Sequence, residues 1–70
     1  MNENQKIILA WLRAKQLQNA DAPLLTLSSF GWQHFGDELP DDIEFAYKKM
    51  TKVEDYEVMA EFVRLGLEEN

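Results

Sequence analysis

Four side chains near the middle of the chain are of the types that form a hydrolytic triad: Ser28, Ser29, His34 and Asp37. A serine nucleophile of this kind often lies in a Gly-x-Ser-x-Gly turn between a strand and a helix, and the segment has no such turn. Ten neighbouring positions also rarely converge on one nucleophile. We therefore expect loop and capping roles for these residues, and we expect that the protein is not an enzyme.

Four carboxylates within six residues come closest to a cation site: Asp37, Glu38, Asp41 and Asp42. Their order departs from the Asp-x-[Asp/Asn]-x-[Asp/Asn]-Gly spacing of a calcium loop. The chain has one histidine and no cysteine, so it lacks the ligands of a typical zinc site. Acids around the first turn of a helix complement its dipole. We expect that role here, with cation binding as the alternative, and we predict no metal and no cofactor.

The densest aromatic cluster lies in the segment Phe30-Gly-Trp-Gln-His-Phe-Gly, and residues 31–39 are predicted to form a loop. In one interpretation this loop folds back, and Trp32 and Phe35 close the open end of a helical bundle. In the other, one of them stays exposed as an anchor for a partner protein. The partner-binding candidates are Trp32, Phe35, Asp37, Glu38, Asp41 and Asp42.

Apolar residues at helical spacing, with start signals before them, predict the elements that position these groups. The predicted helices cover about residues 4–19, 22–30, 40–50 and 52–67. Their start signals are the pair Asn2 and Gln5, the sequence Asp21-Ala-Pro, Pro40 with the acids after it, and the pair Thr51 and Glu54. The second helix is the short one, and its Leu-Thr-Leu would also fit an extended segment. The prediction is an all-α fold, a small bundle of three principal helices plus one short helix, in a single domain of residues 1–70.

The first and fourth helices are predicted to form the centre of this bundle, because they carry the longest apolar faces. Residues of the fourth helix are expected to meet residues of the first. The predicted contacts join Val58, Met59, Phe62 and Val63 to Ile8, Trp11 and Leu12.

The fourth helix has a narrow polar stripe and an apolar arc that covers about two-thirds of its circumference. The stripe consists of Glu54, Glu57, Glu61, Arg64 and Glu68. So wide an arc needs cover from two sides, and a chain of 70 residues has little hydrophobic surplus of its own. One interpretation is a homodimer in which Val58, Phe62 and Leu65 pair across a two-fold axis. The competing interpretation is a monomer in which the Phe30–Phe35 loop covers the same residues.

The chain carries 13 acidic and 7 basic side chains, a net charge of −6. Residues 36–70 hold eleven of the acids and four of the bases. No apolar run approaches the ~18 residues of a membrane span, and the first residues lack the basic start of a secretory signal. A soluble, cytoplasmic protein without membrane contact is expected.

The third and fourth helices, joined by a tight turn, have the outline of a helix-turn-helix. A recognition helix presents basic and amide side chains to the nucleic acid. The fourth helix presents glutamates instead, and the one basic cluster is Lys48, Lys49 and Lys52 near a helix end. Direct nucleic-acid binding is therefore not expected.

Three segments resemble small helical proteins encoded in phages and prophages of Gram-positive bacteria. They are Asn-Glu-Asn-Gln-Lys-Ile-Ile-Leu-Ala-Trp-Leu at the start, Phe45-Ala-Tyr-Lys-Lys-Met-Thr, and Tyr56-Glu-Val-Met-Ala-Glu-Phe. The resemblance brings no activity and no functional residues. It implies a small accessory protein that binds a host or phage protein.

Together these observations predict a small acidic protein-binding module whose partner is a protein. The alternative is an acidic mimic of nucleic acid that occupies the basic groove of a DNA-binding or nuclease protein. Its carboxylates would be Asp37, Glu38, Asp41, Asp42, Glu44, Glu54, Glu57 and Glu61.

Overall fold

The computed structural model describes residues 1–19 and 22–69, and within them it has four helices and no strand. The helices are α1 (Glu3–Asn19), α2 (Pro23–Phe35), α3 (Asp41–Lys48) and α4 (Lys52–Glu69). The predicted all-α fold is confirmed, but α3 and not α2 is the short helix. The predicted cap at Asp21 lies outside the described residues.

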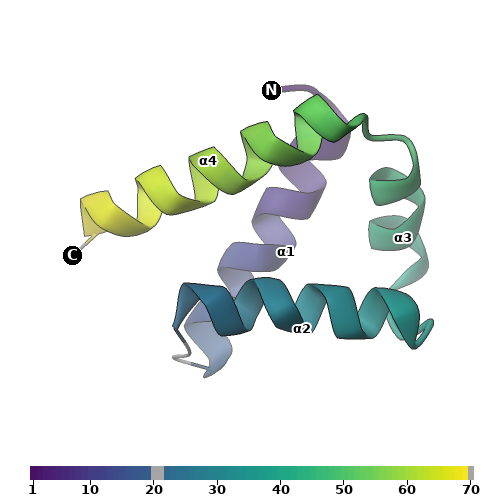
Figure 1. The fold of residues 1–70 in the computed structure, drawn as a ribbon, viewed down its shortest axis with the longest axis horizontal. Coiled ribbons are helices and arrows are strands. Elements are labelled where there is room, and N and C mark those ends of the chain that lie inside the picture. The colour runs from purple at the N-terminus through teal and green to yellow at the C-terminus, as the bar shows by residue number, and fades with distance from the viewer. Residues whose placement is uncertain (20–21, 70) are drawn as a thin grey trace.

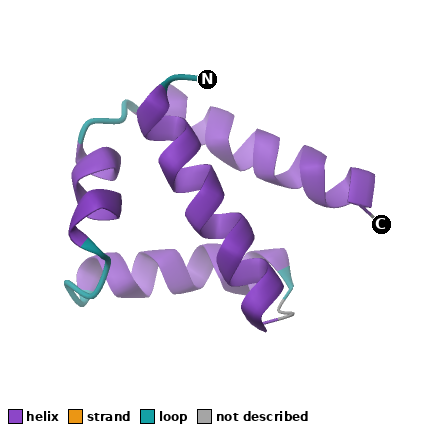
Figure 2. Ribbon diagram, turned by 180° about the vertical axis from the view of Figure 1, so that it is seen from behind, coloured by secondary structure: helices purple, strands orange, loops and turns teal. Residues whose placement is uncertain are grey.

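Helix α1 is the centre of the fold. It packs against each of the other three helices. It runs diagonally across the molecule, behind α2 and α4 in Figure 1 and in front of them in Figure 2. Helix α3 lies at one edge, between the end of α2 and the start of α4. Helix α4 packs mainly on α1, so the prediction that α1 and α4 share the centre holds only for α1.

The core draws on α1, α3, α4 and the turn before α3. Its buried members are Ile8, Leu12, Leu39, Ile43, Ala46, Val58 and Phe62. Trp11, Phe30 and Tyr47 pack against this cluster. Phe30 lies edge to face with both of the others, with ring centroids 5.4 Å from Trp11 and 5.0 Å from Tyr47. Met59 and Val63, which were predicted to belong to this core, are exposed on α4 instead.

Both predicted capping boxes are present, and they hold the starts of α1 and α4 together. The backbone N–H of Gln5 donates to Asn2 Oδ1 at 2.9 Å, and the backbone N–H of Asn2 donates to Gln5 Oε1 in return. Thr51 and Glu54 pair in the same way. The buried Gln5 also donates from Nε2 to Glu57 Oε1 at 2.9 Å and to the Glu54 carbonyl. Each box therefore caps the start of its own helix, and the Gln5 side chain joins the two starts.

Helix α2 continues through Gly31 to Phe35, so the prediction of a loop over residues 31–39 is wrong for its first half. Leu27, Phe30 and His34 share one face and hold the helix against its neighbours. The helix ends in a Schellman turn, in which the Glu38 amide bonds the Gln33 carbonyl at 2.8 Å. Asp37 takes the left-handed conformation there, with φ 58°. The contacts of Phe30 and His34 outweigh the roughly 1 kcal/mol that a glycine costs inside a helix.

Candidate interaction surfaces

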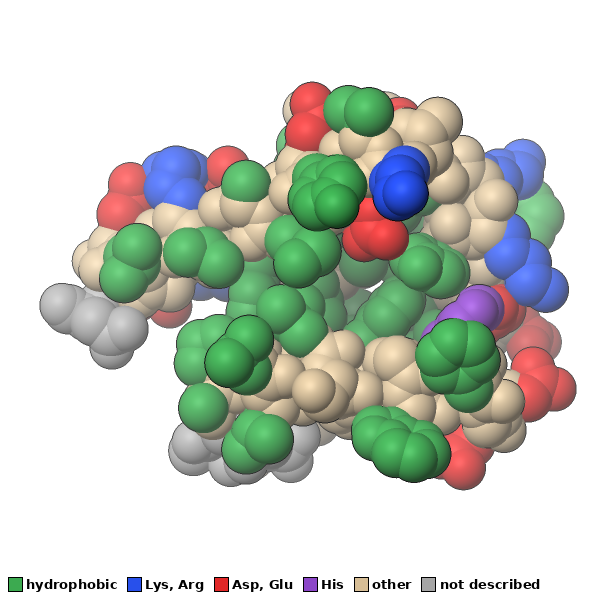
Figure 3. Space-filling model, viewed as in Figure 1, with side chains coloured by type: hydrophobic (Ala, Val, Ile, Leu, Met, Phe, Trp, Pro, Cys, Tyr) green, Lys and Arg blue, Asp and Glu red, His purple; other side chains and the backbone are tan. Residues whose placement is uncertain are grey.

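The described residues expose more large hydrophobic side chains than they bury. Seven hydrophobic residues form the buried core, whereas twelve large ones are exposed. Isolated exposed leucines are ordinary, but contiguous apolar patches mark interaction sites. Figure 3 shows hydrophobic side chains along both α2 and α4 and in the hollow between them. Three regions of this surface contain the residues predicted to bind a partner or a second copy, or lie next to those residues.

The first region is the aromatic–acidic corner, which we define as Trp32, Phe35, Asp37, Glu38, Asp41 and Asp42. These six candidates lie at the end of α2, in the turn after it and in the first turn of α3, and all six are exposed. Trp32 is 79% exposed and Phe35 86%. The interpretation in which both aromatics close the bundle is therefore wrong.

The periodicity of α2 explains the division of its aromatic residues. Phe30 and His34 are four residues apart and face inward, where His34 lies edge to face with Tyr47 at 5.1 Å. Trp32 and Phe35 are three residues apart and fall on the opposite face. The second half of α2, which was predicted to be a loop, is helical and directs the two rings outward.

The side chains of triad type are not assembled into a triad. His34 Nδ1 lies 3.0 Å from Glu44 of α3, and Ser29 Oγ accepts a hydrogen bond from Gln33 Nε2 at 3.1 Å. Asp37 lies in the turn after α2, and Ser28 is exposed on the helix. The geometry makes His34 a link between α2 and α3.

Beside this link, Tyr47 donates from its hydroxyl to Asp55 Oδ2 at 3.4 Å and so joins α3 to α4. Burial raises the pKa of Tyr47, and the negative charge of Asp55 and the hydrogen bond to it raise the pKa further. The neutral phenol is thus the form that this junction favours.

The carboxylates do not form a metal centre in the part of the chain that the structure describes. No group of three or more His, Cys, Asp or Glu residues there is placed to hold an ion. At least four of the eight carboxylates that a nucleic-acid mimic would use are already engaged: Glu44 with His34, Glu54 with Thr51, Glu57 with Gln5 and Glu61 with Arg64. The hydrogen bond to Arg64 lowers the pKa of Glu61.

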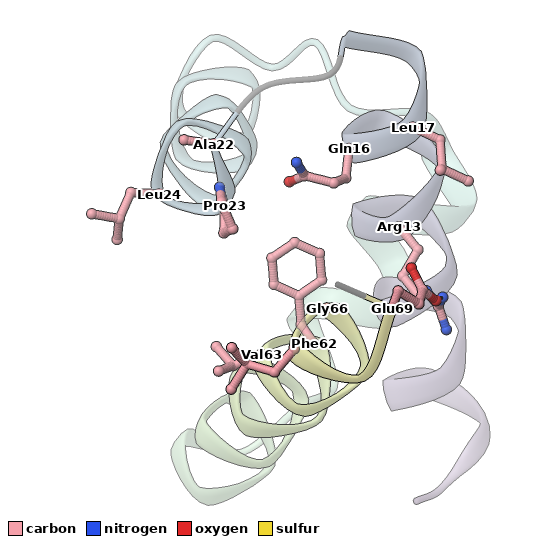
Figure 4. Close-up of a pocket in the computed structure, with 11 residues that line it drawn as sticks. Arg13, Gln16, Leu17, Ala22, Pro23, Leu24, Phe62, Val63, Gly66 and Glu69 are labelled. Carbon is pink, nitrogen blue, oxygen red and sulfur yellow. The ribbon is translucent and has the colours of Figure 1, made fainter.

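The second region is an apolar pocket of about 690 Å³ between the end of α1, the start of α2 and the end of α4. Phe62 projects into it from α4, and Leu24 and Val63 flank its opening (Figure 4). An ion pair between Arg13 and Glu69 lies on its other side. Sequence reasoning missed this pocket, because it forms only where the end of α4, which is distant in sequence, meets the end of α1 and the start of α2.

The third region is the outer stripe of α4, which we define as Val53, Tyr56, Ala60, Val63 and Leu67. All five are exposed. The predicted dimer residues lie elsewhere: Val58 is 1% exposed, Phe62 is 5% exposed, and Leu65 is half-buried. That predicted seam is wrong because α1 already covers it. The spacing could not have located the exposed face, because the polar stripe of α4 has the same three-four-three-four spacing as the outer stripe.

No helix in the described ranges has both the length and the apolar character needed to span a bilayer. Comparison with known proteins found no match to this chain among protein-family models, curated sequences or solved structures.

Proposed function

We propose that the protein is a non-enzymatic binding module and that its aromatic–acidic corner holds a protein partner. The observation that carries the proposal is the exposure of two large aromatic rings, Trp32 and Phe35, at the end of a helix whose opposite face is packed. Aromatic residues are enriched among the residues that dominate binding energy in protein interfaces. A ring fixed on a packed helix also loses little conformational freedom on binding.

The charge around the two rings indicates the chemistry of the partner. Asp37, Glu38, Asp41 and Asp42 are exposed beside them, and no described cation pairs with these four. A matching surface would have an apolar pocket for the rings and a rim of Lys and Arg. The resemblance of the sequence to small phage and prophage proteins supports the same role, with a host or phage protein as the partner.

Site-specific photo-cross-linking in cells that naturally make the protein tests the proposal. A benzophenone amino acid at position 35 should give a discrete adduct with one protein, and the added variant Trp32→Ala should reduce its yield on the order of tenfold. In an extract of the same cells, Asp41→Asn with Asp42→Asn should reduce the yield further at low salt, and added salt should remove that difference.

Position 17 supplies the control. Leu17 is also a large exposed hydrophobic residue, at 78%, but it lies on α1 beside the start of α2, at the opposite end of α2 from the corner. The same cross-linker at position 17 should not give the adduct. Equal adducts from positions 17 and 35, or a yield that does not depend on Trp32, would show that the corner is not the binding site.

A further inference from the structure

The outer stripe of α4 faces away from the core. On a helix of 100° per residue, Val53, Tyr56, Ala60, Val63 and Leu67 fall within roughly 80° of one another, opposite the buried Val58 and Phe62. Their spacing of three, four, three and four residues is that of a coiled-coil seam. No charged residue interrupts the stripe.

The spacing of the stripe is nearly symmetric about Ala60. Val53 and Leu67 each lie seven residues from it, and Tyr56 and Val63 lie four and three residues away. Turned end for end, the stripe therefore matches itself to within one residue, about 1.5 Å of helix. We infer that α4 pairs with α4 of a second copy, antiparallel, with the two-fold axis at Ala60.

The charges beside the stripe fit the same arrangement. Glu57 and Arg64 flank it on one side, three residues before Ala60 and four residues after it. Antiparallel pairing about Ala60 places Glu57 of each copy opposite Arg64 of the other, which gives two opposite-charge pairs. These pairs would add to the bonds that the monomer already has, from Gln5 to Glu57 and from Arg64 to Glu61 and Glu68. A parallel pair would lack this match. The small Ala60 side chain allows the two helices to approach closely at the axis.

The exposed area of the monomer leaves surface available for such a contact. Its accessible surface is 4987 Å², about a tenth more than the roughly 4,500 Å² typical of a chain of this mass. Val63 and Leu67 also line the pocket beside α2, so the apolar surface continues past the stripe. A standard interface buries about 800 Å² on each partner. The net charge of −6 on each copy opposes association, so we expect a dimer that forms at tens of micromolar.

A second copy fits the stripe better than a different protein does. Self-matching spacing and mutual Glu–Arg placement are needed when a surface meets its own copy, because a two-fold interface uses the same patch twice. A different partner would need neither feature. The dimer uses α4 and leaves the aromatic–acidic corner, at the end of α2, outside the contact.

Sedimentation equilibrium of the full chain tests the dimer, with a monomer mass of 8.2 kDa as reference. The wild type should approach twice that mass at tens of micromolar. Ala60→Glu places two like charges at the axis and should weaken association on the order of 100-fold. Ala10→Glu is the matched control, because Ala10 is exposed on α1, and it should behave as wild type.

The absence of native cysteine allows the orientation to be tested by disulfide formation. Ala60→Cys should form a linked dimer under mild oxidation, because only residues near the axis bring their Cβ atoms within about 4.5 Å of their own copies. Val53→Cys lies on the same stripe, away from the axis, and should link much more slowly. A wild-type mass of 8.2 kDa at every concentration, a dimer that survives Ala60→Glu, or equally fast linking of Val53→Cys would each overturn the inference.

Discussion

At the scale of single residues, the aromatic side chains separate the core from the surface. Phe62 is 5% exposed and packs into the cluster around α1, whereas Phe45 is exposed on α3. Both are phenylalanines in amphipathic helices, and only the tertiary contacts distinguish them. The cost of truncating each ring should therefore differ widely.

Phe62→Ala removes a buried ring and leaves a cavity, which should lower the free energy of unfolding by ~3–5 kcal/mol. Phe45→Ala removes an exposed ring and its contact with Lys49, and it should cost less than about 1 kcal/mol. Urea denaturation at low micromolar concentration, where self-association does not contribute, measures both. Equal losses in the two variants would show that the assignment of the core is wrong.

At the scale of elements, local signals predicted the helix starts and tertiary contacts decided one helix end. Asn2 with Gln5 and Thr51 with Glu54 are capping boxes in the sequence and in the structure, because a capping box needs only residues three apart. The end of α2 depends on contacts of Phe30 and His34 with residues of other helices. A local pattern with two glycines could not show that those contacts exist.

Gly31 in the interior of α2 provides a test at this scale. A Cβ atom added at Gly31 would meet nothing within 4 Å, so Gly31→Ala should raise the free energy of unfolding by ~0.5–1 kcal/mol. Gly36 is the control: its Cβ would lie 3.2 Å from the Trp32 carbonyl oxygen, so Gly36→Ala should bring no gain. Thermal and urea denaturation measure both variants. Destabilisation by Gly31→Ala would contradict a helix that continues to Phe35.

At the scale of the whole molecule, one central helix supports three others and leaves much of their apolar surface uncovered. The sequence correctly predicted an all-α chain with four of its core residues: Ile8, Leu12, Val58 and Phe62. It predicted the wrong exposed face of α4, because an apolar arc does not show which of its sides meets α1. The corner residues were predicted as candidates, but their common exposure follows from the unpredicted second half of α2.

The two proposed surfaces have a joint consequence for binding. Trp32 lies eight residues along α2 from Leu24 at the pocket, about 12 Å of helix. The corner thus lies away from the α4 contact, and a dimer through α4 would leave both of its aromatic–acidic corners accessible. A partner with two matching sites would then bind both corners.

The availability of Trp32 is the central claim, and tryptophan fluorescence tests it most directly. The chain has two tryptophans: Trp11 packs against Phe30 at 5.4 Å, and Trp32 is 79% exposed. In Trp11→Phe, the remaining Trp32 should emit like free tryptophan and be quenched readily by iodide and acrylamide. In Trp32→Phe, the remaining Trp11 should emit at shorter wavelength and be shielded. A blue-shifted, shielded Trp32 in the folded Trp11→Phe variant would contradict the account.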